Sequence, residues 1–93
     1  MKTCLYIRSY GRVQGVGYRF FVMRAANEHQ IQGWVRNEND GSVCICAEGE
    51  EHDIQAFIET VRARRDPHIR VDKIEVHESQ EKSCKGFTIH HGT

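Results

Sequence analysis

Apolar and polar residues alternate along residues 4–10, which predicts a half-buried strand whose Leu5 and Ile7 side chains face a core. The alternation stops at Gly11. Residues 18–30 then have helix-forming composition without Gly or Pro, and small or apolar side chains recur on one helical face. That face consists of Val22, Ala25, Ala26 and His29. We therefore expect a strand, a glycine-containing loop and a helix, in that order.

Two more strands and a second helix follow in the middle of the chain. Residues 33–37 and 42–47 have strand composition, and the Asp-Gly pair in the connection 38–41 favours a tight antiparallel hairpin. Acidic residues then precede a second helix, where they suit the positive end of the helix dipole. We expect Asp66-Pro67 to end this helix. Its apolar stripe consists of Ile54, Phe57, Ile58 and Val61.

A fourth strand is expected over 71–78, a polar loop over 78–86 and a short terminal strand over 87–90. The order β-α-β-β-α-β is that of the α+β, ferredoxin-like sandwich, a four-stranded antiparallel sheet with two helices on one face. Here a short extra C-terminal strand is added. The right-handed crossover rule makes strands one and two parallel, on either side of strand three. The glycine-rich loop after strand one and Asn37 at the end of strand two should therefore be neighbours.

Length and charge limit the classes of function that fit. The 93 residues suffice for one domain, so we expect a single domain over 1–93. Thirteen basic residues balance thirteen acidic ones, and the summed field gives no attraction to nucleic acid or to an anionic membrane. No apolar run is long enough for a membrane span, and no signal peptide is evident. We expect a cytoplasmic monomer with neither nucleic-acid nor membrane partners.

Cysteines and histidines give no sign of a metal site. The four cysteines include no C-x-x-C pair and none of the usual zinc spacings, so we expect no metal. Strand parity puts Cys4, Cys44 and Cys46 on the open sheet face. We expect all four thiols to stay reduced, as is usual for cytosolic proteins; the alternative is an oxidised pair, for which Cys4 and Cys46 are the expected partners. The six histidines are dispersed, and the expectation for His90-His91 is an unanchored C-terminal end without a functional role.

The segment that carries chemistry is 11–19, which places Gly11, Gly15 and Gly17 between a strand and a helix N-terminus. Glycine permits positive φ, so successive backbone N–H groups can converge on an anion, and the helix end adds partial positive charge. Arg19 can add a two-point guanidinium contact to the same anion. The alternative is a glycine-rich turn with a surface arginine. The P-loop and dinucleotide patterns both fail, because no Lys follows Gly17 and Phe20 stands where a third glycine is needed.

Residues 11–19, 33–37 and 40–43 together resemble the two-part signature of the acylphosphatases. The similarity extends through 47–49 and the second helix to 87–89, and so covers nearly the whole chain. It implies a ferredoxin-like fold and an enzyme that hydrolyses the carboxyl-phosphate anhydride bond of acyl phosphates to carboxylate and inorganic phosphate. It also implies small-molecule substrates, competition by inorganic phosphate or sulfate, and no metal or organic cofactor.

The resemblance also implies a role for each signature residue. Arg19 would hold the phosphate and Asn37 would orient the attacking water. The alternative for Asn37 is that it merely caps the hairpin before Asp40-Gly41. A carboxylate is a good leaving group and needs no general acid at neutral pH, so positioning and charge stabilisation can suffice. The implied phosphate cradle uses the backbone N–H groups of Val13, Gln14, Gly15, Val16, Gly17 and Tyr18.

Two other functions fit the same order of elements. An RNA recognition motif would carry aromatic residues on its third strand, whereas 42–47 contains none. An accessory acylphosphatase-like domain, such as the one in hydrogenase maturation proteins, would lie in a long multidomain chain. We expect a free-standing enzyme because the sequence begins and ends with the domain. Trp34 is interpreted as a packing residue and not as part of the site.

Overall fold

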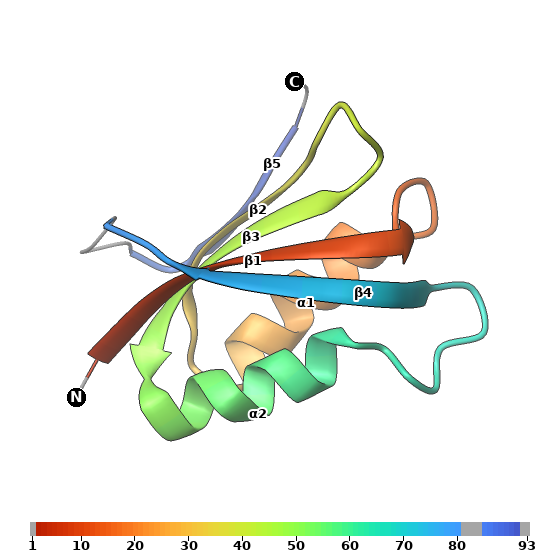
Figure 1. The fold of residues 1–93 in the computed structure, drawn as a ribbon. Coiled ribbons are helices and arrows are strands. Elements are labelled where there is room, and N and C mark those ends of the chain that lie inside the picture. Colours follow the sequence, from red (N-terminus) through yellow and green to blue (C-terminus); the bar gives the residue numbers. More distant parts are fainter. Residues whose placement is uncertain (1, 81–84, 92–93) are drawn as a thin grey trace.

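The computed structural model describes residues 2–80 and 85–91, which fold into a single sheet covered on one face by two helices (Figure 1). Among these residues, none forms a helix on the other face of the sheet. The order of elements is the predicted one, with a short strand after the βαββαβ unit. The elements are β1 (Lys2–Arg12), α1 (Tyr18–Glu28), β2 (Gln32–Asn37), β3 (Val43–Glu50), α2 (Glu51–Val61), β4 (Arg70–Glu78) and β5 (Phe87–His90).

The strand order β4-β1-β3-β2-β5 confirms the predicted arrangement and adds a fifth strand to one edge. The pairs β1–β3, β1–β4 and β2–β3 are antiparallel, and β5 runs parallel to β2. Val43 of β3 lies opposite Ser9 of β1 on one side and opposite Asn37 of β2 on the other. The carboxyl ends of β1 and β2 therefore share one end of the sheet, as the crossover rule predicts.

The hydrophobic core lies between the sheet and the helices. Both predicted apolar stripes are buried, with the exception of His29, which lies half-buried at the C-terminal end of α1 and hydrogen-bonds Thr60 at 2.9 Å. Because each helix buries one face only, both are held by packing against the sheet. The largest fully buried side chains include Tyr18, Phe57, Ile7, Ile45, Ile54 and Val22.

Two predicted boundaries were wrong, each because of a backbone feature that composition did not reveal. The helix α2 ends at Val61, well before Asp66-Pro67, because Ala63 adopts a left-handed φ of 51°. The strand β1 passes through Gly11 to Arg12, with a shift of register against β4. Gly11 has a φ of 135°, and a Cβ atom there would collide with the carbonyl oxygen of Arg70. Glycine thus continues the strand instead of ending it.

The register between β1 and β3 corrects the expected pairing of Cys4 with Cys46. Cys4 lies opposite Glu48, and Cys46 lies opposite Tyr6. The two cysteines are therefore diagonal neighbours, roughly 7–8 Å apart and beyond the usual reach of a disulfide. Cys44 and Cys46 are on the predicted face of the sheet, yet both are buried. Cys84 lies outside the described residues.

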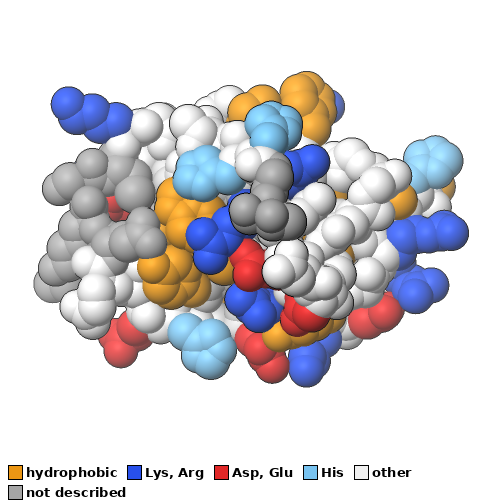
Figure 2. Space-filling view, turned by 90° about the horizontal axis from the view of Figure 1, so that it is seen from above, with side chains coloured by type: hydrophobic (Ala, Val, Ile, Leu, Met, Phe, Trp, Pro, Cys, Tyr) orange, Lys and Arg blue, Asp and Glu red, His pale blue; other side chains and the backbone are white. Residues whose placement is uncertain are grey.

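The face of the sheet away from the helices is covered by long side chains (Figure 2). Hydrophobic, basic and acidic groups are intermixed there. Trp34 is central to this layer, since the Arg36 guanidinium lies 4.6 Å from its ring centroid and the His90 ring stacks on it at 5.2 Å. Trp34 therefore packs against its neighbours, in agreement with the packing role expected for it.

Candidate active site

The glycine-rich loop joins β1 to the N-terminus of α1, and two of its residues have left-handed backbone conformations. Gly15 has φ 75° and Gly17 has φ 81°. Gly17 is also the N-cap of α1, and within the described part of the chain no side chain caps the helix. No acidic residue stands in the first turn to balance the helix dipole. The loop and the helix end therefore present uncompensated backbone N–H groups, which is the arrangement that binds anions.

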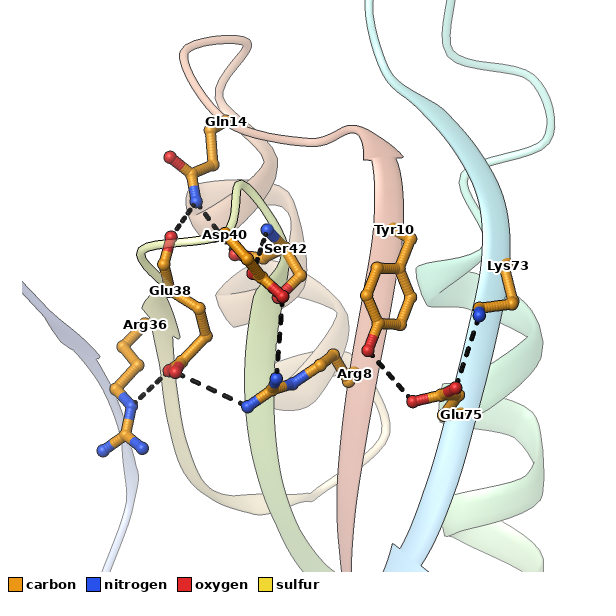
Figure 3. A network of polar contacts seen from close by, with 9 residues as sticks. All are labelled: Arg8, Tyr10, Gln14, Arg36, Glu38, Asp40, Ser42, Lys73 and Glu75. Carbon is orange, nitrogen blue, oxygen red and sulfur yellow. Dashed lines mark hydrogen bonds and ion pairs between the residues drawn. The ribbon is translucent and has the colours of Figure 1, made fainter.

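The Gln14 side chain ties this loop to the hairpin between β2 and β3. Its Nε2 donates hydrogen bonds to the carbonyl oxygens of Glu38, at 2.8 Å, and of Ser42, at 2.9 Å (Figure 3). Both acceptors belong to the hairpin that follows Asn37. Sequence reasoning assigned Gln14 a backbone contribution only, and missed this side-chain role. No local signal could reveal it, because the partners lie 24 and 28 residues further along the chain.

The Tyr18 side chain anchors the loop from inside the core. Its hydroxyl donates to the Val61 carbonyl oxygen at 2.7 Å and lies 2.9 Å from the Ser9 Oγ. One side chain thus joins the start of α1 to the end of α2 and to β1. Burial raises the pKa of Tyr18 to about 12, although the hydrogen bond with Ser9 acts in the opposite direction. Tyr18 therefore stays neutral over the physiological range.

We predict that Tyr18→Phe lowers the free energy of unfolding by about 1–2 kcal/mol at neutral pH, because the Val61 carbonyl loses a buried donor. The folded pKa of Tyr18 is raised, so its contribution to stability is present below about pH 10 and is lost as the pH rises towards 12. The stability gap between wild type and variant should therefore narrow at alkaline pH. Urea unfolding of both proteins from neutral pH towards pH 12 measures this difference in unfolding free energy. A difference that stays constant over that range would contradict the raised pKa of Tyr18.

Arg19 follows in the first turn of α1, and its guanidinium reaches across to β5. Its Nη1 donates to the His90 carbonyl oxygen at 2.9 Å. The contact is exposed and uses one of the five guanidinium N–H groups. It fixes where the guanidinium lies, and no other hydrogen bond from it to residues 2–80 or 85–91 competes with an anion for the remaining donors.

A pocket of about 230 Å³ brings the predicted site together. Among the described residues that line it, Arg19 is the only lysine or arginine. Of the predicted site residues, Gln14 and Val16 are not in its lining: Gln14 points to the hairpin, and Val16 packs against the core. The pocket is lined by Val13, Gly15, Gly17, Tyr18, Arg19, Phe20, Asn37, Ile89 and His91.

Asn37 is the last residue of β2 and lies at the wall of this pocket. Its Oδ1 atom is buried and accepts no hydrogen bond within the part of the chain that the structure describes. Buried polar atoms in proteins are almost always hydrogen-bonded, so an amide oxygen in this state is a site for a water or ligand donor. The cap interpretation gains no support, because the hairpin is closed by other groups. Glu38 N–H donates to Ser42 O at 2.8 Å, and Ser42 N–H donates to Asp40 Oδ1 at 2.9 Å.

A polar network holds the hairpin beside the pocket (Figure 3). Glu38 accepts from Arg36 Nε at 2.6 Å and pairs with Arg8 at 3.5 Å. Arg8 also lies 3.8 Å from the Asp40 carboxylate, whose pKa is lowered mainly by the hydrogen bond from the Ser42 hydroxyl. These two arginines are therefore already paired with carboxylates. The network leaves Arg19 as the cation available to an anion in the pocket.

The terminal strand contributes more to the pocket than the sequence indicated. His90 stacks on Trp34 and its carbonyl oxygen accepts from Arg19, whereas Ile89 and His91 line the pocket. The expectation of an unanchored His90-His91 end was therefore wrong. The end is anchored because β5 pairs in parallel with β2, which fixes residues 87–90 at the sheet edge.

Within residues 2–80 and 85–91 no group of three or more His, Cys, Asp or Glu side chains is placed to hold a metal ion. No helix among these residues is long and apolar enough to cross a membrane.

Comparisons with known proteins agree with the sequence resemblance. The acylphosphatase family model matches residues 5–89. An acylphosphatase of Oceanobacillus iheyensis is 49% identical over 71 residues, which cover 76% of this chain and 78% of the relative. The crystal structure of acylphosphatase from Bacillus subtilis superposes with a TM-score of 0.89 at 40% identity, covering 98% of this chain and 100% of that chain. HypF of T. kodakarensis matches with a TM-score of 0.84 at 38% identity, over 100% of this chain and 12% of that chain.

Proposed function

Because the chain belongs to the acylphosphatase family, we propose that the pocket between the glycine-rich loop and Asn37 hydrolyses the carboxyl-phosphate anhydride bond of acyl phosphates. The products are a carboxylate and inorganic phosphate. The observation that carries the assignment is the meeting, in one pocket, of an arginine with unused donors and a buried amide oxygen without a partner among the described residues. An anion site and a water site thus lie side by side.

The phosphate is held by the loop and by Arg19. Backbone N–H groups of residues 13–18 and the N-terminus of α1 supply partial positive charge, and the guanidinium supplies a full charge and a planar pair of donors. Charge redistributes over the phosphoryl oxygens as the anhydride bond breaks. Donors fixed in advance around those oxygens stabilise the transition state without having to reorganise.

Asn37 positions the attacking water. A water that donates to the buried Oδ1 is held with a lone pair free to attack phosphorus. The amide is too weak a base to remove the proton, so Asn37 orients the water and does not activate it. The proton passes to a phosphoryl oxygen, and the electron pair of the broken P–O bond leaves with the carboxylate. No general acid is needed, because the leaving group is stable as an anion at neutral pH.

The chemistry just described uses no cofactor, and we propose a metal-independent enzyme. We also propose that residues 1–93 act as a single domain, as a monomer, in the cytoplasm, on small acyl phosphates. Inorganic phosphate and sulfate should bind the same cradle, since it recognises the tetrahedral anion and not the acyl group.

The direct test is hydrolysis of benzoyl phosphate by the purified protein with a chelator present. We expect full activity, and we expect inorganic phosphate to raise the apparent KM of the substrate without changing kcat. A protein that is active only after addition of a divalent metal would overturn the metal-independent mechanism. Inhibition that lowers the maximal rate alone would show that phosphate binds elsewhere.

A further inference from the structure

Phe20 is an exposed aromatic side chain at the edge of the proposed active site. It follows Arg19 in the first turn of α1, lines the same pocket, and is 56% exposed. Val76, on the distant strand β4, is the other large hydrophobic side chain among the described residues with comparable exposure, at 44%. An aromatic ring held partly in water beside an anion site offers apolar surface that a bound molecule can cover.

The direction of the reaction indicates which part of the substrate reaches Phe20. In phosphoryl transfer the attacking and leaving oxygens lie roughly in line, on opposite sides of phosphorus. Water held by Asn37 therefore attacks from the β2 side, and the acyl group leaves on the side away from Asn37. The β2–β5 register places Ile89 opposite Val35, so β5 runs beside the segment that ends in Asn37. Ile89 and His91 accordingly belong to the side on which the water lies.

Few of the residues that line the pocket can contact the acyl group on the side away from Asn37. Val13 and Tyr18 are each 1% exposed, so their side chains serve the core. Gly15 and Gly17 offer only backbone, which faces the phosphate. Phe20 is the remaining apolar side chain, and it projects from the helix whose N-terminus holds the anion.

We propose that Phe20 forms the acyl-binding wall of the site and selects acyl phosphates whose acyl group is apolar, with planar aromatic acyl groups favoured over small ones. This inference rests on the proposed function. A phenyl group bonded to the acyl carbon can stack on the Phe20 ring or meet it edge to face, and each arrangement excludes water from both rings. An acetyl group is too small to cover the ring and gains little from it. Inorganic phosphate has no acyl group and should not interact with Phe20.

The test compares benzoyl phosphate with acetyl phosphate in the wild-type protein and in Phe20→Ala. For each protein, kcat/KM for benzoyl phosphate is divided by kcat/KM for acetyl phosphate. Comparing this ratio between variant and wild type cancels the different intrinsic reactivities of the two anhydrides. We expect this preference for benzoyl phosphate to fall roughly five- to tenfold, the effect of one aromatic contact, mainly through a higher KM for benzoyl phosphate. Phe20→Tyr should retain the preference, because the ring is kept. The inhibition constant of inorganic phosphate should be unchanged in both variants.

Val76→Ala is the matched control, since it truncates the other exposed hydrophobic side chain at a position outside the pocket. It should leave the substrate preference unaltered. A Phe20→Ala protein that keeps the wild-type preference while hydrolysing both substrates would overturn the acyl-wall assignment and leave the proposed function intact. A wild-type protein that hydrolyses neither substrate would instead overturn the proposed function, and the inference with it.

Discussion

Replacing Arg19 with alanine should strongly weaken both phosphate binding and turnover. In the proposed mechanism the guanidinium contacts the anion in both the ground state and the transition state, so its loss should affect affinity and rate together. We expect phosphate affinity to fall roughly ten- to a hundredfold, as for the loss of hydrogen bonds to a charged group. The value of kcat/KM should fall on the order of a thousandfold, in the range seen when an arginine that stabilises phosphoryl transfer is removed. Calorimetric phosphate titration and steady-state kinetics measure the two effects.

Stability should change little in this variant, because the hydrogen bond from Arg19 to the His90 carbonyl is exposed. Arg19→Lys should recover only a small part of the activity, since a lysine ammonium supplies charge without the planar pair of donors. Arg24→Ala is the matched control: it removes an exposed arginine from the same helix, outside the pocket lining, and should be close to wild type. Normal phosphate binding by Arg19→Ala would exclude the guanidinium from the anion site.

Replacing Asn37 with alanine should lower turnover while nearly preserving phosphate affinity, because the proposed partner of Asn37 is water and not the phosphate. Losing an orienting hydrogen bond that acts chiefly in the transition state should cost about 3 kcal/mol or more, hence at least roughly a hundredfold in kcat. The Oδ1 atom accepts no hydrogen bond from the described residues, so its removal breaks no hydrogen bond of that atom within that part of the fold. The substitution should therefore be tolerated by the fold. Steady-state kinetics and phosphate titration on the same preparation test whether kcat falls while phosphate affinity is retained.

Asn37→Asp should be no more active than Asn37→Ala, because a carboxylate repels the phosphate and lacks the amide donor. Asn39→Ala provides the control, as it truncates an exposed amide in the neighbouring hairpin and should leave kcat unchanged. A folded Asn37→Ala protein with near-normal kcat would remove Asn37 from the mechanism.

The local conformations of the site could be predicted because each depends on a few consecutive residues. Gly15 and Gly17 permit the left-handed backbone of the loop, and Asp40-Gly41 permits the tight hairpin after Asn37. The apolar stripe of each helix likewise repeats within three turns of chain. Chain order and the handedness of the βαβ crossover then sufficed to bring the loop and Asn37 to the same end of the sheet.

The sequence could not predict the individual side-chain contacts and the strand registers that join segments far apart in the chain. The side-chain bridge of Gln14 to the hairpin, the hydrogen bond from Arg19 to His90 and the parallel pairing of β5 with β2 all join distant segments. The offset between Cys4 and Cys46 belongs to the same class, because it depends on the register of two strands. A register shift of two residues changes every cross-strand neighbour but keeps each side chain on the same face of the sheet, so the alternation of apolar and polar residues does not reveal it.

The sequence by itself therefore determined the order of elements and pointed to the glycine-rich loop, Arg19 and Asn37 as the proposed site, since backbone preference and side-chain chemistry are properties of single residues and their neighbours. Only the tertiary structure decided that Arg8 and Arg36 pair with Glu38, that Arg19 has donors left over from its contacts with the described residues, and that Phe20 lies exposed at the pocket. Those properties depend on which side chains are in contact after folding. Strand pairing and the packing of distant segments determine these contacts, whereas the local order of residues along the chain does not.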